Sequence, residues 1–310
     1  MNKGHILTTE EKQIKQQRLE ENRRLHSTTQ CISKSIKTES SPIDLQPVNE
    51  INIFSWNLTE NDRTLLNSID NAYQTALQST PPVSTFVQLE LAPDRMSAYM
   101  NTLDIQNYAV LKLIQFIRQI EEFEQLNEHD RFILVKYNLT LLLMIRYAET
   151  FDPTGELIYM DSRITNYSPS DIAFAQHYKS LYILCYGYEF NCLAMSVFHT
   201  IYQLVNQDSM LTQLLLLNMI FLKGLSAVDD QEPSLNDSIS AFFAHSKYTD
   251  LLFRYLIEKS SFESAAIKMM RITEIFIKIQ RLMRDFQNFI KSKVDVNCVN
   301  PLMKSILNFT

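Results

Sequence analysis

The stretch FIRQIEEFEQLNEHDRFILVKYNLTLLLMIR, residues Phe116–Arg146, predicts two successive amphipathic helices that each carry a cation. Arg118 lies just before the first helix stops at the acidic segment that follows it. The second helix opens at Asn127 with Asp130 at its third position, which is a capping-box arrangement, and it then becomes almost wholly apolar. Its cation is Lys136. We therefore expect these helices to lie in the middle of a protein, with both cations at the border of one hydrophobic groove.

The composition of the chain favours an all-α protein. Its 310 residues are 45% hydrophobic, which is enough to bury a sizeable core. Only four glycines are present, and this scarcity argues against Rossmann and P-loop phosphate sites, both of which depend on glycine-rich turns. A single small β-hairpin is expected from PTGELIYMDSRI, residues 153–164.

The chain divides into a tail and one large domain. Residues 1–52 are expected to form a charged, basic extension followed by a linker rich in Ser, Thr and Pro. Residues 53–310 are expected to form the folded domain. A capping-box pattern at Thr59 and Asp62 predicts the start of its first helix. Another helix start is expected at Ser168, which precedes a proline and has Asp171 at the third position.

Taken together, these features resemble a nuclear receptor ligand-binding domain of the vitamin D, pregnane X and ecdysone-related branch. The positions that carry the central resemblance are Phe116, Arg118 (for the usual Lys), Ile120, Phe123, Leu126, Asp130, Leu134, Lys136 and Arg146, while Arg131 stands where the family usually has Gln. The segment MIRYAETFD, residues 144–152, is similar to vitamin D receptor-like members. Residues 5–24 resemble the basic extension after the zinc module, and PLMKSIL, residues 301–307, resembles the final activation helix. The resemblance implies a three-layer antiparallel helical sandwich with one small β-hairpin.

The resemblance also implies a pocket for a lipophilic ligand. Carried over by position, its walls would comprise Ile105, Gln106, Ala109, Leu143, Arg146, Tyr147 and Thr150. A guanidinium on an apolar helix must find an acceptor, which would be either a polar group of the ligand or an oxygen of the protein itself. A pocket filled by the protein's own side chains is the alternative, because eighteen Phe and fourteen Tyr supply ample bulk.

A coregulator groove is implied by Arg118, Lys136, Leu302 and Ser305. Lys136 would meet the carbonyl end of a Leu-rich coactivator or corepressor helix, where the helix dipole is negative. Ser305 occupies the position where the family has a glutamate, and the loss of that charged contact would weaken coactivator binding by about 1.5–3 kcal/mol. The alternative is two solvated cations at helix ends.

A sustained apolar seam follows near the end of the chain. It consists of Ile272, Ile275, Phe276, Ile279, Leu282, Met283 and Phe286, which recur at spacings of three and four residues. The pattern alone leaves open whether the seam is one buried face of the bundle or a subunit interface. The resemblance implies a homodimer or a heterodimer with a retinoid X receptor-like partner.

Other functional classes have little support in the sequence. Cys185, Cys192 and His199 recur at intervals of seven residues, a spacing that on one helix holds side chains roughly 10 Å apart and therefore does not form a zinc site. No catalytic constellation is apparent, so we expect no enzyme and no cofactor in this chain. The net charge of −6 makes the globular part a poor DNA binder, so zinc and DNA contact are expected only in an upstream module. No membrane segment is expected.

The sequence therefore predicts a nuclear, ligand-regulated transcription factor domain with a degenerate activation helix. The alternative is a ligand-independent helical scaffold or dimerisation module in transcription.

Overall fold

The structure, a computed structural model, describes residues 56–79, 92–160, 167–224, 232–293, 299 and 301–306. Expectations for residues 1–52, including the basic extension and the linker, lie outside these residues. The described residues belong to one compact unit, Ser55–Thr310. Its elements are α2 (Glu60–Gln78), α3 (Arg95–Ile117), α4 (Glu121–Glu124), α5 (Glu128–Glu149), β1 (Phe151–Asp152), β2 (Leu157–Ile158), α6 (Pro169–Tyr186), α7 (Tyr188–Val205), α8 (Ser209–Ile220), α9 (Ser238–Lys259), α10 (Phe262–Lys293) and α11 (Pro301–Ile306). The fold is all-α with one small antiparallel hairpin, as the sequence predicts.

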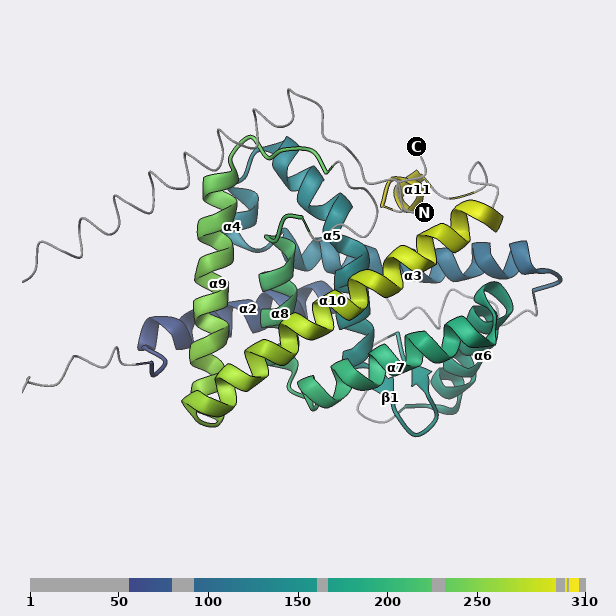
Figure 1. The fold of residues 1–310 in the computed structure, drawn as a ribbon, viewed down its shortest axis with the longest axis horizontal. Coiled ribbons are helices and arrows are strands. Elements are labelled where there is room, and N and C mark those ends of the chain that lie inside the picture. Colours follow the sequence, from purple (N-terminus) through teal and green to yellow (C-terminus); the bar gives the residue numbers. More distant parts are fainter. Residues whose placement is uncertain are drawn as a thin grey trace, which may run out of the picture. The chain divides into compact units, whose positions relative to one another are not determined.

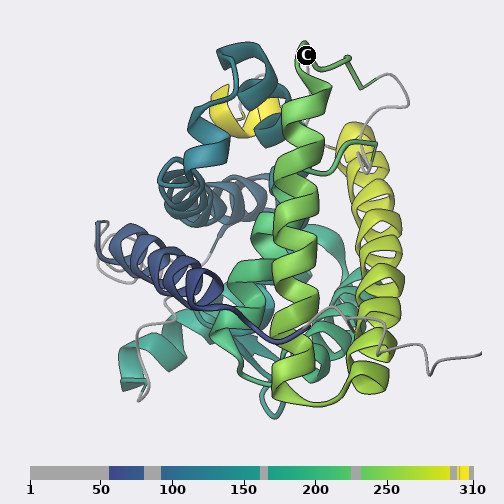
Figure 2. The ribbon, with the colours of Figure 1, turned by 90° about the vertical axis from the view of Figure 1, so that its left-hand side faces the viewer.

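The helices pack in three layers (Figures 1 and 2). α5 and α8 pack together in the central layer, with α9 against α8. α2 and α3 cover one side of this layer, and α7 and α10 cover the other. Every residue of α8 from Leu211 to Ile220 is buried, as is the stretch of α5 from Leu141 to Ala148. A helix that is apolar all round must be covered on all sides, which is why these two segments occupy the centre.

Local capping signals place several helix starts where the sequence predicts them. Thr59 and Ser168 form reciprocal capping boxes at the starts of α2 and α6. Asn127 caps α5 by accepting a hydrogen bond from the backbone N–H of Asp130. The expected return bond from Asp130 to the backbone of Asn127 is replaced by a longer-range contact. The buried Asp130 carboxylate instead accepts from the backbone N–H groups at the start of α9.

Two departures from the expected elements lie between helices. The acidic segment after Arg118, expected to end the helical pattern, contains the one-turn helix α4. The seven-residue spacing of Cys185, Cys192 and His199 does not follow one helix, because α6 ends at Tyr186 and α7 begins at Tyr188. Gly187 between them has φ +88°, a left-handed conformation that interrupts the helix and favours glycine.

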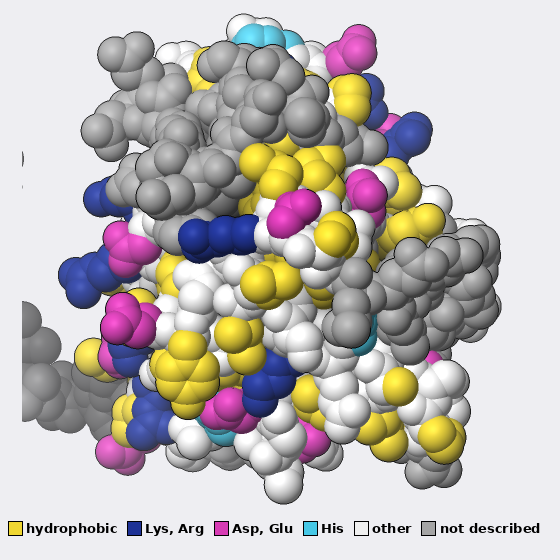
Figure 3. Space-filling model, turned by 90° about the vertical axis from the view of Figure 1, so that its right-hand side faces the viewer, with side chains coloured by type: hydrophobic (Ala, Val, Ile, Leu, Met, Phe, Trp, Pro, Cys, Tyr) yellow, Lys and Arg dark blue, Asp and Glu magenta, His cyan; other side chains and the backbone are white. Residues whose placement is uncertain are grey.

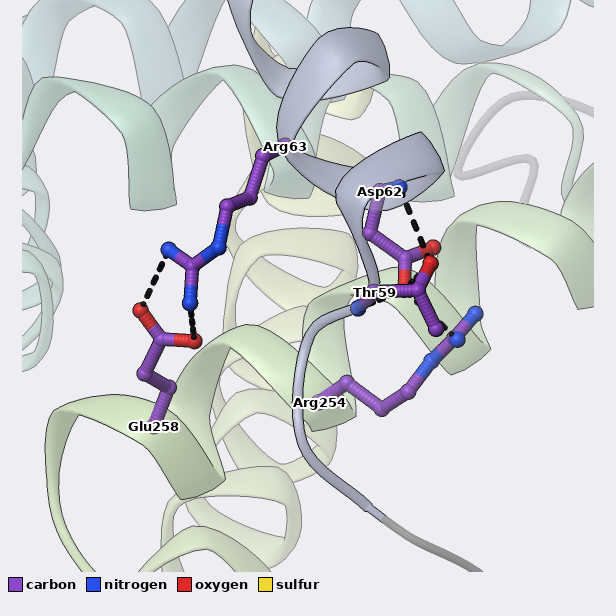
Figure 4. A network of polar contacts seen from close by, with 5 residues as sticks. All are labelled: Thr59, Asp62, Arg63, Arg254 and Glu258. Carbon is purple, nitrogen blue, oxygen red and sulfur yellow. Dashed lines mark hydrogen bonds and ion pairs between the residues drawn. The ribbon is translucent and has the colours of Figure 1, made fainter.

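Ion pairs fasten the first turn of α2 to the last turns of α9 (Figure 4). Arg63 donates two hydrogen bonds, of 3.0 and 2.8 Å, to the carboxylate of Glu258. Asp62, which also caps α2 with Thr59, accepts from Arg254 Nη1 at 2.8 Å. These contacts join residues about 190 positions apart in the sequence, and they hold the outer layer against the central one.

Within the described part of the chain, no helix combines the length and the apolar character needed to cross a bilayer.

Candidate functional site

The surface around Arg118 and Lys136 is formed by the end of α3 and the first half of α5. Arg118 is the C-cap residue of α3, is exposed, and donates from Nε to Glu124 at 3.3 Å. Arg131 also pairs with Glu124, at 2.6 Å, so this carboxylate of α4 is shared between two guanidinium groups. The Lys136 ammonium lies 5.9 Å from the centre of the Phe132 ring. Arg118 is thus partly neutralised, whereas Lys136 rests against an aromatic surface.

The terminal helix α11 packs against α5 and α3, and it lies beside them in both ribbon views (Figures 1 and 2). Met303 is 1% exposed and anchors this helix in the core, while Leu302 and Ser305 are half-buried. Lys304 is the cation of this short helix. Leu302 and Ser305 therefore belong to a helix that packs on the two helices that carry Arg118 and Lys136, and Ser305 offers a hydroxyl rather than a carboxylate.

An internal cavity lies behind α11, between α3, α5, α6, α7 and α10. Its volume is about 40 Å³, and it is lined by Gln106, Thr140, Leu143, Met144, Tyr147, Glu156, Ile158, Tyr178, Lys179, Tyr182, Asn191, Met195, Phe198, Met283, Phe286 and Met303. Drug-sized ligands occupy cavities of roughly 300–1,000 Å³, whereas a single water needs about 10–15 Å³. The cavity thus has room for a few waters.

Three of the residues predicted to bind ligand line this cavity, namely Gln106, Leu143 and Tyr147. Ile105 and Ala109 are buried elsewhere in the core. They lie on the same helix as Gln106 but are not part of the cavity wall.

Arg146 does not line the cavity, and its partner is a carboxylate of the protein. It is 4% exposed and pairs with Glu149 at 3.2 Å, one turn later on α5. Glu149 also accepts hydrogen bonds from Tyr73 at 2.5 Å and from Ser209 at 2.7 Å. The sequence left open whether the guanidinium meets a polar group of a ligand or an oxygen of the protein, and in the structure it meets an oxygen of the protein. Thr150, which donates to the backbone oxygen of Tyr147, lies at the C-cap of α5 and borders a different cleft.

The polar groups of the cavity are the uncharged Thr140 hydroxyl, tyrosines and amides, apart from Glu156 and Lys179, which pair with each other at 3.2 Å. Burial raises the pKa of Tyr178 to about 12, and it raises the pKa of Tyr147 well above the usual value. Gln106 donates to Tyr178 Oη at 3.3 Å. The neutral phenols are compatible with a few bound waters.

Most of the cavity wall was not identified from the sequence. Tyr178 and Tyr182 come from α6, and Asn191, Met195 and Phe198 come from α7, a region in which the resemblance is weak. Their only sequence signal is helical periodicity, which marks a buried face without showing which cavity that face borders.

The apolar seam of α10 faces the interior of the chain. Ile272, Ile275, Phe276, Ile279, Leu282, Met283 and Phe286 are all at most 8% exposed, and α10 packs on α5, α7 and α9. The assignment of these seven residues to a dimer interface is therefore wrong, because a second subunit does not reach side chains that the chain already buries. Up to residue 286, where side-chain burial is described, the large hydrophobic residues that α10 exposes are Phe262, Ile267, Met270 and Ile277.

Exposed hydrophobic side chains also lie together near the start of α9, where Ile239, Phe242 and Phe243 are each more than 60% exposed and the ring centres of Phe242 and Phe243 are 6.0 Å apart. On the face that includes α6, the described hydrophobic residues form several separate groups among polar atoms (Figure 3). Within the described residues there is also no group of three or more His, Cys, Asp or Glu side chains that would hold a metal ion.

A search of protein-family models and a search of curated proteins each found no match for this chain.

Proposed function

We propose that this chain is a nuclear receptor-type regulatory domain that recruits a Leu-rich coregulator helix to the surface between α3 and α5. The observation that carries the proposal is the packing of α11 on α5 and α3, the two helices that carry Lys136 and Arg118. On this proposal the chain acts in the nucleus, and direct DNA contact depends on a zinc module outside it.

The chemistry of this surface suits an amphipathic helix. Phe132 is 55% exposed on α5, and half-buried Ile114 and Val135 belong to the ends of α3 and α5 that border it. Leucines of a partner helix gain free energy by covering such side chains. Lys136 is placed on α5 to meet the negative, carbonyl end of the partner helix. Ser305 supplies no charge for the opposite end, so we expect weak coactivator binding or a preference for corepressors.

On this proposal the domain recruits its coregulator without a bound lipophilic ligand. A cavity of about 40 Å³ offers no room for a sterol or a retinoid without displacing side chains. The packing of side chains around the buried Met303 stabilises the docked position of α11. A bound lipophilic ligand is then not needed to stabilise that position.

Peptide binding tests the proposal. A fluorescent peptide containing Leu-x-x-Leu-Leu is titrated with the wild-type chain and with the variant Lys136→Ala, and a peptide with the leucines replaced by alanine serves as the ligand control. Loss of one charge-assisted contact is expected to weaken binding by about tenfold. Lys278→Ala, on the exposed face of α10 where Lys278 pairs with Glu274, is the matched control and should bind like the wild type. Absence of saturable binding, or equal binding by all three proteins, would contradict the proposal.

A second candidate function is self-association through the exposed face of α10. The observation that favours it is the spacing of Ile267, Met270 and Ile277, which places three exposed hydrophobic side chains on one stripe of the helix. Sedimentation equilibrium should then show a dimer that Met270→Asp dissociates. Ile239→Asp, at an equally exposed position on α9, should leave the dimer intact, and a monomeric wild-type chain would exclude this function.

A further inference from the structure

A cleft much larger than the internal cavity opens beside the β-hairpin. Its volume is about 610 Å³, within the range of small-molecule sites. It is lined by Gln74, Leu77, Glu149, Thr150, Phe151, Asp152, Pro153, Tyr159, Tyr167, Tyr202, Gln207 and Ser209. These residues come from α2, the end of α5, the hairpin, the starts of α6 and α8, and α7. This cleft next to the hairpin therefore has the volume for a small molecule that the cavity behind α11 lacks.

Aromatic rings form much of this cleft. Tyr159 and Tyr167 stack with ring centres 3.5 Å apart and nearly parallel planes. Phe151 contacts Tyr202 of α7 edge-on, with ring centres 6.1 Å apart. Burial and the nearby carboxylate of Asp152 raise the pKa of Tyr159, so its ring stays a neutral phenol. The faces of neutral aromatic rings carry partial negative charge and attract cations.

The charged groups of the cleft are carboxylates alone. Among the described residues that line it, Glu149 and Asp152 are acidic and none is Lys, Arg or His. Glu149 is balanced by Arg146. No described cation pairs with Asp152: its carboxylate accepts hydrogen bonds from the backbone N–H groups of Thr154 and Gly155 in the hairpin turn. The cleft therefore carries a net negative charge beside aromatic faces.

We propose that this cleft binds a small organic cation of the alkylated ammonium class. The positive group would lie against the half-buried rings of Tyr167 and Tyr202, because Tyr159 is only 7% exposed, and Asp152 would supply the opposing charge. Alkyl groups on the nitrogen reduce its hydration, which makes contact with aromatic rings more favourable than contact with water. This inference is independent of the coregulator surface, which involves other residues, so either proposal can fail alone.

Isothermal titration with choline and with 3,3-dimethylbutan-1-ol tests the charge requirement, because the two molecules have nearly the same shape and only choline is charged. Saturable binding of choline with no binding of the neutral alcohol is the expected result. Failure of choline to bind saturably at millimolar concentration, or equal binding of the alcohol, would overturn the inference.

Two variants test the place of binding. Tyr202→Leu removes a half-buried ring from the cleft, and Asp152→Asn removes the charge while keeping a side-chain oxygen for the turn. Each should weaken choline binding by about five- to tenfold. Tyr188→Leu is the matched control on the same helix, because Tyr188 is 70% exposed and lies outside the cleft. Circular dichroism establishes that each variant is folded, and unchanged affinity in a folded Asp152→Asn variant would place choline elsewhere.

Discussion

Replacing Asp130 by alanine should destabilise this domain more than any surface substitution. The side chain is 0% exposed, and its carboxylate accepts hydrogen bonds from the backbone N–H groups of Asn236 and Asp237, both at 2.8 Å. A third bond, also 2.8 Å, comes from Nδ2 of Asn127. Hydrogen bonds to a charged group contribute about 1.5–3 kcal/mol each, and an alanine would leave two backbone donors without their acceptor. We therefore expect Asp130→Ala to lower the free energy of unfolding by about 3–5 kcal/mol.

The pH dependence of stability gives a second, independent measurement. Burial alone would raise the pKa of Asp130, but the hydrogen bonds from Asp237, Asn236 and Asn127 outweigh it and hold the pKa below the usual value. A carboxyl group whose pKa is lower in the folded state stabilises the protein above the unfolded-state pKa of about 3.9, and that stabilisation is lost as the pH falls through the folded-state value. The difference between wild type and variant should hence be constant from pH 7 to about pH 5 and shrink on further acidification.

Urea unfolding followed by circular dichroism measures both effects. Asp104→Ala is the matched control, because Asp104 is exposed on α3 and desolvation raises its pKa, so its ionised form contributes no stability. The reasoning is refuted if Asp130→Ala and Asp104→Ala differ by less than about 1 kcal/mol at pH 7, or if the effect of Asp130→Ala is the same at pH 3 as at pH 7.

Further predictions concern the ion pairs and the helix caps. Arg146→Ala should lower the free energy of unfolding by about 3–5 kcal/mol in urea titrations, because it leaves the carboxylate of Glu149 buried without its cation; a loss below about 1 kcal/mol would show that Glu149 does not depend on the pair. Arg63→Ala should cost less than about 1 kcal/mol, and the cost should fall further in high salt, since Arg63 and Glu258 are 50% and 37% exposed. Thr59→Ala should cost about 1 kcal/mol by removing the cap of α2, and an unchanged urea midpoint would contradict the role of the capping box.

Local features of the fold could be predicted because their causes are local in sequence. A hydroxyl at Thr59 or Ser168 reaches a backbone N–H three residues later whatever the rest of the chain does. The hairpin after α5 likewise follows from short apolar runs around a turn. Such signals fix where elements begin and end, and they leave open which elements meet.

Contacts between distant segments could not be predicted. The partners of Asp130 lie more than 100 residues away at the start of α9, so the side chain was interpreted as a simple cap. The seam of α10 has the same spacing whether it faces its own core or a second subunit. Carrying positions over from the family resemblance likewise did not separate Gln106, which lines the cavity, from the buried Ile105 and Ala109 beside it.

The fastening of α2 to α9 determines how tension along the chain is distributed. A pull on the polypeptide that precedes Trp56 reaches α2 at Thr59, where the helix begins, and is opposed there by Arg254 and Glu258 of α9. The load then passes into α9 through these ion pairs, and into α3 and α8 through the packed face of α2. The ion pair between Arg63 and Glu258 is accessible to solvent, so rising ionic strength would weaken the contact between α2 and α9 before it affected the packing of the other helices.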